Sequence, residues 1–370
     1  MEKSTVVIHG GRPKKVTGAP LNYPIGVSST FVAGGSAIYS RFGTQVTRGL
    51  EDLIADLEGG ETVSFASGLA AVKAVVDTCA RLLGRAIDVA IVEGAYNGTR
   101  VQLNGAKGLT VRSISTLSAQ SPDEFCRGLQ DLESIDLLWL ETPTNPLMSV
   151  LPIQRAAALA KEKGAMVVVD NTFATPISTN PIELGADVVI HSATKYFGGH
   201  SDVLGGTASF ADPDIAREVD LYRRLNGSIL GDFEAFLILR GIRTLSLRVR
   251  AACDNASALL ELLGEHLDAS AIYHPSLLVG KAGYEFLPRQ MLLYGSMLSF
   301  DLGPNPFHAE RFCERLQLAV NSTSLGAVET QVERREKQEV GISPGLIRVS
   351  VGIEAQRDLL QDFASALERL

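Results

Sequence analysis

Several features that define specialised protein classes are scarce in this 370-residue sequence. It has four cysteines, and none belongs to a CxxC pair or to a cysteine–histidine cluster. We therefore expect no disulfide framework and no metal site, and we expect the cysteines to be buried as small hydrophobic side chains in a reducing compartment. Long apolar runs and an apolar leader after Met1 are also lacking, which predicts a soluble, cytoplasmic protein that does not bind a membrane.

Positive charge is also in short supply. Lysine and arginine together number 34 against 42 aspartate and glutamate, and the formal net charge is −8 with histidine neutral. The overall field repels phosphate backbones, so nucleic acid is not an expected partner, although this sum allows a locally positive pocket. Hydrophobic residues make up 45% and charged residues 21%, as in globular proteins, and the length suits two domains.

The hydrophobic pattern divides the chain into three parts. Residues 1–43 are rich in Gly, Pro, Ser and Thr and lack periodicity, which predicts an extended N-terminal arm. Residues 44–232 begin with an amphipathic helix that ends at Gly59-Gly60, and apolar strands then alternate with helices. Residues 233–370 begin with a long helical stretch to Leu263 and end with a helix over Arg357–Leu370, which predicts a smaller α+β domain.

The middle part has the pattern of an α/β protein. Its predicted strands are Thr62–Phe65, Asp88–Val92, Leu109–Val111, Ile135–Leu140, Met166–Val169, Val188–Ile190 and Gly206–Phe210. Its predicted helices are Leu69–Leu83, Tyr96–Asn104, Pro122–Leu132, Ile153–Lys163 and Asp214–Leu225. Because most of the strands are apolar on both faces and alternate with helices, we predict a mostly parallel, doubly wound sheet. Two further strands are predicted in the smaller domain, at Met297–Leu302 and Leu346–Val351.

Two of the predicted buried strands are followed by ionisable residues that can take part in catalysis. Asp170 comes directly after Val167–Val169, and Lys195 lies within His191–Asp202, after the next strand. Ligands of α/β proteins bind at the carboxyl ends of parallel strands. Taken alone, Asp170 is more often a helix-capping residue, and Lys195 is more often a surface group with a buried stem. A lysine withdrawn from water, however, is an amine nucleophile that forms Schiff bases with aldehydes.

A third segment predicts a phosphate site. Phe65–Ala71 runs from a strand through small residues into a helix, so the N–H groups of Gly68 and Leu69 are free at the helix start. Ser192 and Thr194 flank the lysine with hydroxyls that can hydrogen-bond an anion. An amine for an aldehyde, an acid for a ring nitrogen and a cradle for a phosphate are together what pyridoxal 5'-phosphate (PLP) requires.

The motifs around these residues closely resemble the Cys/Met-metabolism family of fold-type I PLP-dependent enzymes. Val169–Pro176 (VDNTFATP) and Ser192–Asp202 (SATKYFGGHSD) carry the resemblance most strongly. Further matches are Pro24–Phe31, Tyr39–Arg41, Tyr96–Thr99, Glu141–Pro146, Leu239–Leu245 and Ile347–Glu354, so the resemblance covers nearly the whole chain. The family includes cystathionine γ-synthase, the cystathionine lyases, methionine γ-lyase and the sulfhydrylases. It implies the fold-type I architecture and PLP as the cofactor.

The resemblance also implies roles for individual residues. It implies that Lys195 binds the cofactor aldehyde, that Asp170 keeps the ring nitrogen protonated, and that Tyr96 stacks on the ring and can act as a base. The other residues implied to bind the cofactor are Gly68, Leu69, Thr172, Ser192 and Thr194, with Tyr39 and Arg41 from a neighbouring subunit. The residues implied to bind substrate are Asn145, Thr323, Ser324 and Arg348, of which Arg348 clamps the α-carboxylate. A homodimer is the implied catalytic unit, and two dimers form a tetramer.

The sequence departs from the family where the substrate side chain is expected. Thr323 stands where cystathionine γ-synthases and γ-lyases tend to have a glutamate that faces the distal amino group, so we expect cystathionine to be a poor substrate. Glu329 or Glu333 is the alternative source of that acid. Gly98 stands where methionine γ-lyases often have a cysteine, and segment 332–345 is shorter than in the family and carries a run of charges over 333–337.

These observations predict a lyase of amino-acid metabolism. We expect γ- or β-elimination on an L-amino acid with a side-chain leaving group: sulfur by default, as in transsulfuration, or halide, oxygen or nitrogen in a specialised biosynthetic pathway. The alternative is γ-replacement on an activated homoserine, which differs only in whether a nucleophile traps the intermediate. A NAD-dependent dehydrogenase would need a GxGxxG motif, which the sequence lacks. A non-catalytic relative would not need Lys195, Asp170 and Arg348 together.

Overall fold

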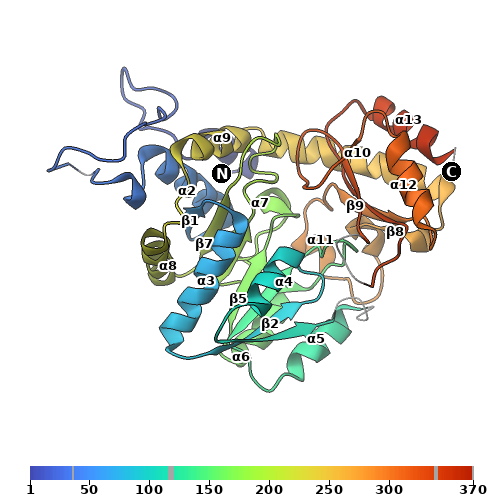
Figure 1. Ribbon diagram of the computed structural model, residues 1–370, viewed down its shortest axis with the longest axis horizontal. Coiled ribbons are helices and arrows are strands. Elements are labelled where there is room, and N and C mark those ends of the chain that lie inside the picture. The colour runs from blue at the N-terminus through green and yellow to red at the C-terminus, as the bar shows by residue number, and fades with distance from the viewer. Residues whose placement is uncertain (36, 116–120, 337–340, 369–370) are drawn as a thin grey trace.

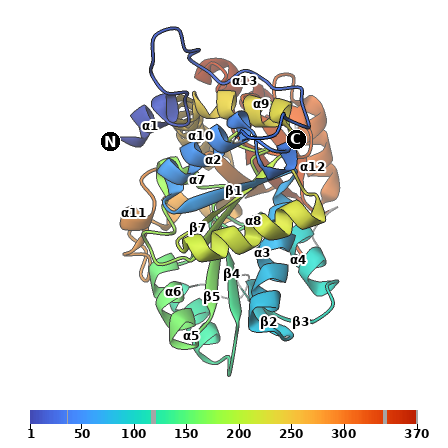
Figure 2. The ribbon, with the colours of Figure 1, turned by 90° about the vertical axis from the view of Figure 1, so that its left-hand side faces the viewer.

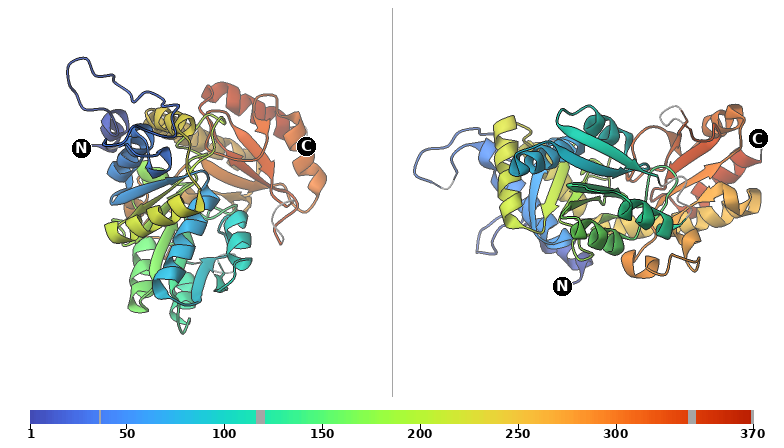
Figure 3. Two further views of the ribbon diagram at one scale, coloured as in Figure 1. Left: turned by 60° about the vertical axis from the view of Figure 1, so that its left-hand side comes forward. Right: turned by 90° about the horizontal axis from the view of Figure 1, so that it is seen from below.

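The chain forms two sheets of unequal size that are bridged by helices. The computed structural model describes residues 1–35, 37–115, 121–336 and 341–368. The larger sheet lies in the blue-to-yellow part of the chain and the smaller one in the orange and red part (Figure 1). Seen from below, the two parts lie side by side along the longest axis (Figure 3). In these residues no helix is both long and apolar enough to cross a bilayer.

Within the described residues, the larger sheet has seven strands. Their spatial order is β1 (Glu61–Phe65), β7 (Gly206–Phe210), β6 (Val188–His191), β5 (Met166–Asp170), β4 (Leu137–Glu141), β2 (Ile87–Val92) and β3 (Leu109–Ile114). Every neighbouring pair from β6 to β3 is parallel, whereas β7 runs antiparallel to both β1 and β6. The predicted mostly parallel sheet is therefore confirmed.

Helices cover both faces of this sheet, which is why its strands are apolar on both sides. The helices are α3 (Gly68–Leu83), α4 (Asn97–Asn104), α5 (Pro122–Gln130), α6 (Ile153–Glu162) and α8 (Pro213–Asn226). Figure 2 places α5 and α6 on one side of β4 and β5 and α3 on the other. Side chains such as Trp139 and Phe125 are fully buried between these layers.

The register of the parallel strands brings polar residues to one edge of the sheet. Asp170, the last residue of β5, pairs with Glu141, the last residue of β4. On its other side Asp170 pairs with Ile190 of β6, and the next residue is His191. Because parallel strands end at the same edge, the loops after β4, β5 and β6 open onto one region.

The smaller sheet has five strands within the described residues. Their order is β10 (Val320–Asn321), β11 (Gln331–Arg334), β12 (Leu346–Ser350), β9 (Met297–Asp301) and β8 (Ile272–Tyr273). Its core includes Phe312 of α12 (Pro306–Arg315), whose ring packs edge-on against Phe300 and against Phe363 of α13 (Gln356–Leu367). This arrangement is the predicted α+β unit, and we propose residue 233 as the boundary between the two domains.

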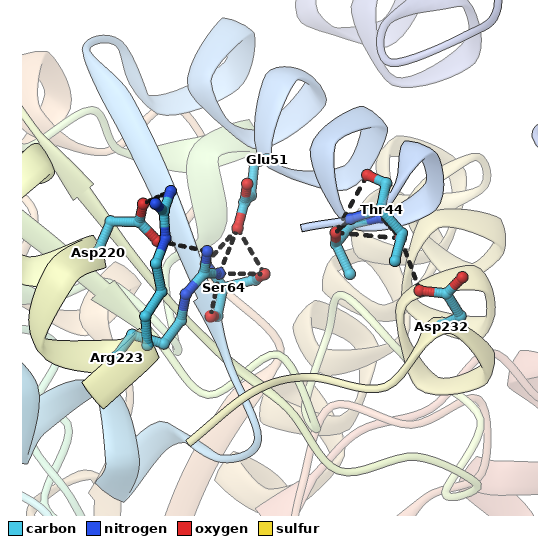
Figure 4. Close-up of polar contacts among 8 residues, drawn as sticks. Thr44, Glu51, Ser64, Asp220, Arg223 and Asp232 are labelled. Atoms are coloured by element: carbon cyan, nitrogen blue, oxygen red, sulfur yellow. Dashed lines mark hydrogen bonds and ion pairs between the residues drawn. The ribbon is translucent and has the colours of Figure 1, made fainter. Parts of the chain in front are cut away.

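Helix α2 (Gln45–Glu58) is held against the larger sheet by polar contacts at its start and middle (Figure 4). Thr44 caps its first turn and donates a hydrogen bond to Asp232, 2.6 Å away, at the start of α9 (Asp232–Ile242). Glu51 accepts hydrogen bonds from the Ser64 backbone and hydroxyl and from Arg223 of α8. These contacts join α2 to β1, α8 and α9.

The structure corrects two expectations about local structure and adds a strand that the sequence did not predict. The arm is not extended throughout, because Lys3–His9 form helix α1, whose Val7 is buried. The long helical stretch after residue 233 is two helices, α9 and α10 (Leu245–His266), because the chain breaks at Arg243-Thr244. Strand β11 was not predicted, because its short run of charged residues lacks strand periodicity. Two predicted features extend beyond the described residues. The predicted helix Arg357–Leu370 includes residues 369–370, and the charged run over 333–337 ends at Lys337.

Candidate active site

A cavity of about 330 Å³ lies at the carboxyl ends of the central strands and reaches the smaller domain. It is lined by residues from β4 to β6, from the start of α3 and from both ends of the segment between β10 and β12. Every predicted site residue except two lines it: Gly68, Leu69, Tyr96, Asn145, Asp170, Thr172, Ser192, Thr194, Lys195, Thr323, Ser324 and Arg348. The structure thus brings together segments that are as many as 280 residues apart in the sequence (68 to 348).

The two predicted residues outside this cavity are Tyr39 and Arg41. Both side chains are exposed and lie on the arm, which projects from the body of the molecule in Figure 1. The Arg41 guanidinium lies 5.3 Å from the centre of the Tyr39 ring, and it donates a hydrogen bond to the backbone oxygen of Arg224. Their predicted role concerns the cofactor of a neighbouring subunit and stays a prediction.

Lys195 lines the cavity and is partly withdrawn from water. Its Nζ donates a 2.6 Å hydrogen bond to Oγ of Ser324. Burial, reinforced by the positive charge of Arg348 and opposed by Glu333, lowers the pKa of Lys195 to about 8. A lysine amine with such a pKa is neutral in a useful fraction of molecules near neutral pH, and the neutral form is the nucleophile and base.

Asp170 faces the same cavity from the end of β5. Its Oδ1 accepts a 3.0 Å hydrogen bond from the backbone N–H of Thr172. Burial raises the pKa of the Asp170 carboxyl above its usual range, while hydrogen bonds from Thr172 and the charge of His191 act in the opposite direction. Thr172 also joins two loops, because its hydroxyl accepts a hydrogen bond from the backbone N–H of Ser192.

The start of α3 supplies the phosphate-binding end of the cavity. Ser67 caps this helix by accepting the N–H of Ala70, and the N–H groups of Gly68 and Leu69 belong to the first turn, where a helix has no carbonyls to accept them. A Cβ on Gly68 would lie only 3.2 Å from Ser192, so glycine lets the two loops approach each other. The Thr194 hydroxyl also lines the cavity and is held by the backbone of Gly205.

Arg348 of β12 is a buried cation held by three groups. Its guanidinium donates to Oδ1 of Asn145 at 3.1 Å, to the carbonyl of Ser324 at 3.0 Å and to Oε2 of Glu333 at 2.8 Å. Burial, with the nearby charge of Arg335, lowers its pKa to about 10, so it remains charged at neutral pH. Ser324 adopts the left-handed conformation at φ 84°, which a non-glycine residue holds only where its surroundings demand it.

The cavity is also lined by Glu333, which the sequence offered as the alternative acid for a distal substrate amine, and by Arg335, to which the sequence assigned no role. Both are buried, and Oε2 of Glu333 accepts hydrogen bonds from Arg335 at 2.7 Å and from Arg348. The usable signal is register: Glu333 pairs directly with Arg348 across β11 and β12. Since two guanidinium groups share this carboxylate, Glu333 is poorly placed to receive a distal substrate amine. Glu329 does not line the cavity within the described residues, and it bonds Ser201 instead.

Tyr96 lines the cavity with a side chain that is 48% exposed. Its backbone N–H donates a 2.6 Å hydrogen bond to Glu141, a cavity residue at the end of β4 that the sequence argument assigned no role. A Cβ on Gly98 would lie 2.4 Å from the Tyr96 ring, so a cysteine at this position would require the tyrosine to move. Glycine at 98 therefore lets this ring lie close to its own helix.

The donor set of the cavity fits PLP. Free N–H groups at the start of α3 and the hydroxyls of Ser192 and Thr194 suit a phosphate, and a buried acid suits a protonated ring nitrogen. Lys195 supplies an amine of lowered pKa for the aldehyde. Among the described residues no group of three or more His, Cys, Asp or Glu side chains is arranged to hold a metal ion. All four cysteines are buried.

Comparison with known proteins gives a consistent result. A family described as "Cys/Met metabolism PLP-dependent enzyme" matches residues 4–368. A cystathionine beta-lyase from Lactococcus lactis subsp. cremoris is 37% identical over 99% of this chain and 98% of its own length. A cystathionine gamma-synthase from Mycobacterium bovis is 36% identical over 98% and 96%. The crystal structure of an apo methionine gamma lyase from Micromonospora echinospora superposes with a TM-score of 0.89, at 34% identity and over 99% of both chains.

Proposed function

Because the chain belongs to the Cys/Met metabolism family of PLP-dependent enzymes, we propose that it catalyses elimination of a leaving group from the side chain of an L-amino acid. The observation that carries this proposal is the double contact of Ser324. Its hydroxyl accepts from Lys195 and its carbonyl accepts from Arg348, so one residue joins the predicted amine to the predicted carboxylate clamp. A substrate amino acid can therefore present its carboxylate to Arg348 with its α-carbon near Lys195.

The residues of the chain have distinct parts in this reaction. When bound, PLP supplies an aldehyde for the substrate amine and a protonated ring that withdraws electrons from the substrate carbons. Arg348 binds the α-carboxylate in a bidentate manner, with Asn145 and Ser324 fixing its orientation. Asp170 holds the proton on the ring nitrogen. The start of α3 binds the phosphate, which keeps the ring in place.

Lys195 moves the protons. With PLP and substrate bound, the free amine of Lys195 would take the proton from the substrate Cα, and it would then take a proton from Cβ so that a group could leave from Cγ. Its low pKa makes it an effective base near neutral pH. Tyr96 is a second base, close to the substrate amine. The Ser324 hydroxyl, 2.6 Å from Nζ in this structure, holds the lysine close to the clamped substrate.

The side-chain pocket selects the leaving group. Sulfur is the default, and halide, oxygen or nitrogen are the alternatives for a specialised biosynthetic pathway. γ-Replacement on an activated homoserine is the second candidate, and the similarity to a cystathionine gamma-synthase favours keeping it. Incubation with β- and γ-substituted amino acids, with detection of keto acid and of the released group, tests elimination. If keto acid forms with none of them and added thiols give substituted products instead, the replacement reaction is correct.

Thr323→Glu is expected to shift the preference of the enzyme toward cystathionine. The new carboxylate would face the distal amino group, and a hydrogen bond to a charged group contributes about 1.5–3 kcal/mol. Thr323 is exposed at the cavity, so solvent weakens the effect, and we expect a rise of about tenfold in kcat/KM for cystathionine relative to a short γ-substituted substrate. Steady-state kinetics on both substrates measure it.

Thr323→Gln is the matched control for that substitution, because it adds the same bulk without charge. It should leave the ratio of the two kcat/KM values close to that of the wild type. Efficient cystathionine turnover by the wild type would contradict the pocket argument while leaving the cofactor assignment intact.

We also propose a cytoplasmic homodimer as the catalytic unit, with two dimers forming a tetramer. The arm supports this proposal, since it carries exposed apolar side chains that a monomer leaves in water: Leu21, Val27, Val32 and Ile38 are each at least 70% exposed. Tyr39 and Arg41 lie on the same arm, where they can reach the phosphate of a neighbouring chain.

Mixed chains carrying Arg41→Ala or Lys195→Ala are expected to regain activity that neither chain has alone. If Arg41 acts on the neighbouring site, each hybrid dimer has one site with both residues intact, so random exchange of equal amounts should restore about a quarter of wild-type activity. Subunit exchange is verified by native mass spectrometry before the assay. No recovered activity in verified hybrids would contradict a shared site.

A further inference from the structure

The carboxylate of Glu58 is buried behind the cavity, at a position that disfavours a negative charge. Glu58 is the last residue of α2 and is 0% exposed. Burial penalises its charge, and the C-terminal end of a helix dipole repels an anion. Its Oε2 has no hydrogen-bond partner among the described residues. A charge placed against both effects needs a strong compensating partner.

His191 and Asn171 are the partners of Glu58. Nε2 of His191 lies 2.5 Å from Oε1 of Glu58, and Nδ2 of Asn171 donates to the same oxygen at 2.8 Å. Asn171 also donates to the carbonyl of Thr179, which fixes its amide. Asn171 is 0% exposed and His191 is 2% exposed. The His191 ring packs on Phe197, with ring centres 4.4 Å apart.

This cluster of Glu58, Asn171 and His191 lies directly behind Asp170. Asn171 follows Asp170 in the chain, and His191 follows Ile190, the residue that pairs with Asp170. Asp170, Ile190 and Ser192 line the cavity, whereas none of the three cluster residues is among the described residues that do. The cluster can therefore affect the cavity only indirectly, through neighbouring residues, and Asp170 is the charged one among these.

Asp170 needs a nearby positive charge to stay ionised, and His191 of this cluster can supply one. Burial favours the protonated, neutral form of Asp170, which cannot stabilise a proton on the ring nitrogen as an anion can. A positive charge on His191 favours the ionised form. A buried imidazolium in turn needs an anion in hydrogen-bond contact, and Glu58 is in that position.

We propose that Glu58 is a positioning residue that holds His191 as an imidazolium behind Asp170, so that Asp170 stays ionised toward the cofactor ring nitrogen. The inference rests on the proposed contact between Asp170 and that nitrogen. Two further charged groups belong to this region: Glu183, and Lys3 of α1, which donates a hydrogen bond to the carbonyl of Pro176. Burial lowers the pKa of Lys3, and attraction to Glu58 and Glu183 opposes this. Lys3 is thus a competing partner for the same carboxylate.

The test compares Glu58→Gln with Glu51→Gln in the holoenzyme. Glu51 is the matched control, since it lies on the same helix in a buried ion pair, but with Arg223 (Figure 4). ¹⁵N NMR of labelled histidine reports the charge of His191, and PLP labelled with ¹⁵N in the ring reports protonation of the ring nitrogen. In Glu58→Gln we expect His191 to become neutral, the ring signal to move toward the unprotonated form and kcat to fall about tenfold, as for one pKa unit at Asp170. Glu51→Gln should keep both wild-type signals.

If Glu58→Gln keeps the wild-type nitrogen signals of His191 and of the ring, the inference is wrong. It is also wrong if Glu58→Gln loses stability while the His191 signal stays unchanged. If Glu58→Gln fails to fold, Glu58→Gln with His191→Phe removes both charges together and keeps a ring against Phe197. The double variant must show the same shift of the ring nitrogen, or the inference is wrong. A wild type that does not bind PLP at Lys195 would overturn the proposed function itself.

Discussion

Lys195→Ala is expected to abolish both covalent cofactor binding and turnover. The variant lacks the amine that attaches the aldehyde and moves the substrate proton, and the proton transfers alone contribute roughly 10²–10⁴-fold to the rate. PLP can still bind through its phosphate, because the start of α3 is unchanged. Absorbance spectra before and after borohydride reduction, followed by peptide mapping, measure the covalent adduct, and keto-acid release measures turnover.

The lowered pKa of Lys195 adds a pH dependence to this result. The amine must be neutral to attack an aldehyde, and burial together with Arg348 brings its pKa to about 8. The rate at which the apo-protein attaches PLP should therefore rise with pH through about 8 and level off above it. Lys163→Ala is the control, because Lys163 caps backbone carbonyls of Gln130 and Leu132 far from the cavity. A reduced pyridoxyl group on any lysine other than Lys195 would refute the assignment.

The sequence predicted those parts of the fold and site that depend on short stretches of neighbouring residues. The central strands β4, β5 and β6 are continuous apolar runs up to their last residue, and in a parallel sheet such runs end at one edge. Asp170 and Lys195 directly follow two of these runs, so their convergence on one cavity follows from chain order and sheet topology. The start of α3 at Gly68 was predictable from chain order too, because the turn of small residues that leads into this helix lies directly after β1.

The contacts that the sequence did not predict depend on burial and register. A run such as Glu333–Arg335 is usually a solvated surface, and charge alone does not indicate that pairing with β12 would bury it beside Arg348. Helix α1 is similar, because Val7 is buried only through tertiary packing of a short segment. Glu58 also gave no signal, since its partners His191 and Asn171 are more than 110 residues away (58 to 171).

Asp170→Asn is expected to bind PLP and lose most of its activity, by roughly two orders of magnitude or more. Asparagine is nearly the same shape and keeps an acceptor for the Thr172 N–H, so the loop after β5 should survive. It has no charge, however, and cannot stabilise a proton on the ring nitrogen. The electron-withdrawing power of the ring then falls, and loss of the Cα proton to Lys195 becomes slow. Turnover, PLP affinity and the ring ¹⁵N shift measure these effects.

Asp187→Asn provides the comparison for this prediction. Asp187 accepts the backbone N–H of Val167 at 2.8 Å, at the opposite end of the strand that Asp170 terminates, so the same substitution there disturbs β5 without touching the cavity. It should cost some stability and leave kcat near that of the wild type. If Asp170→Asn also turned over at nearly the wild-type rate, the ring would not need its proton. The arrangement of a buried acid behind the ring, with His191 and Glu58 in support, would then serve only to hold the loops after β5 and β6 together.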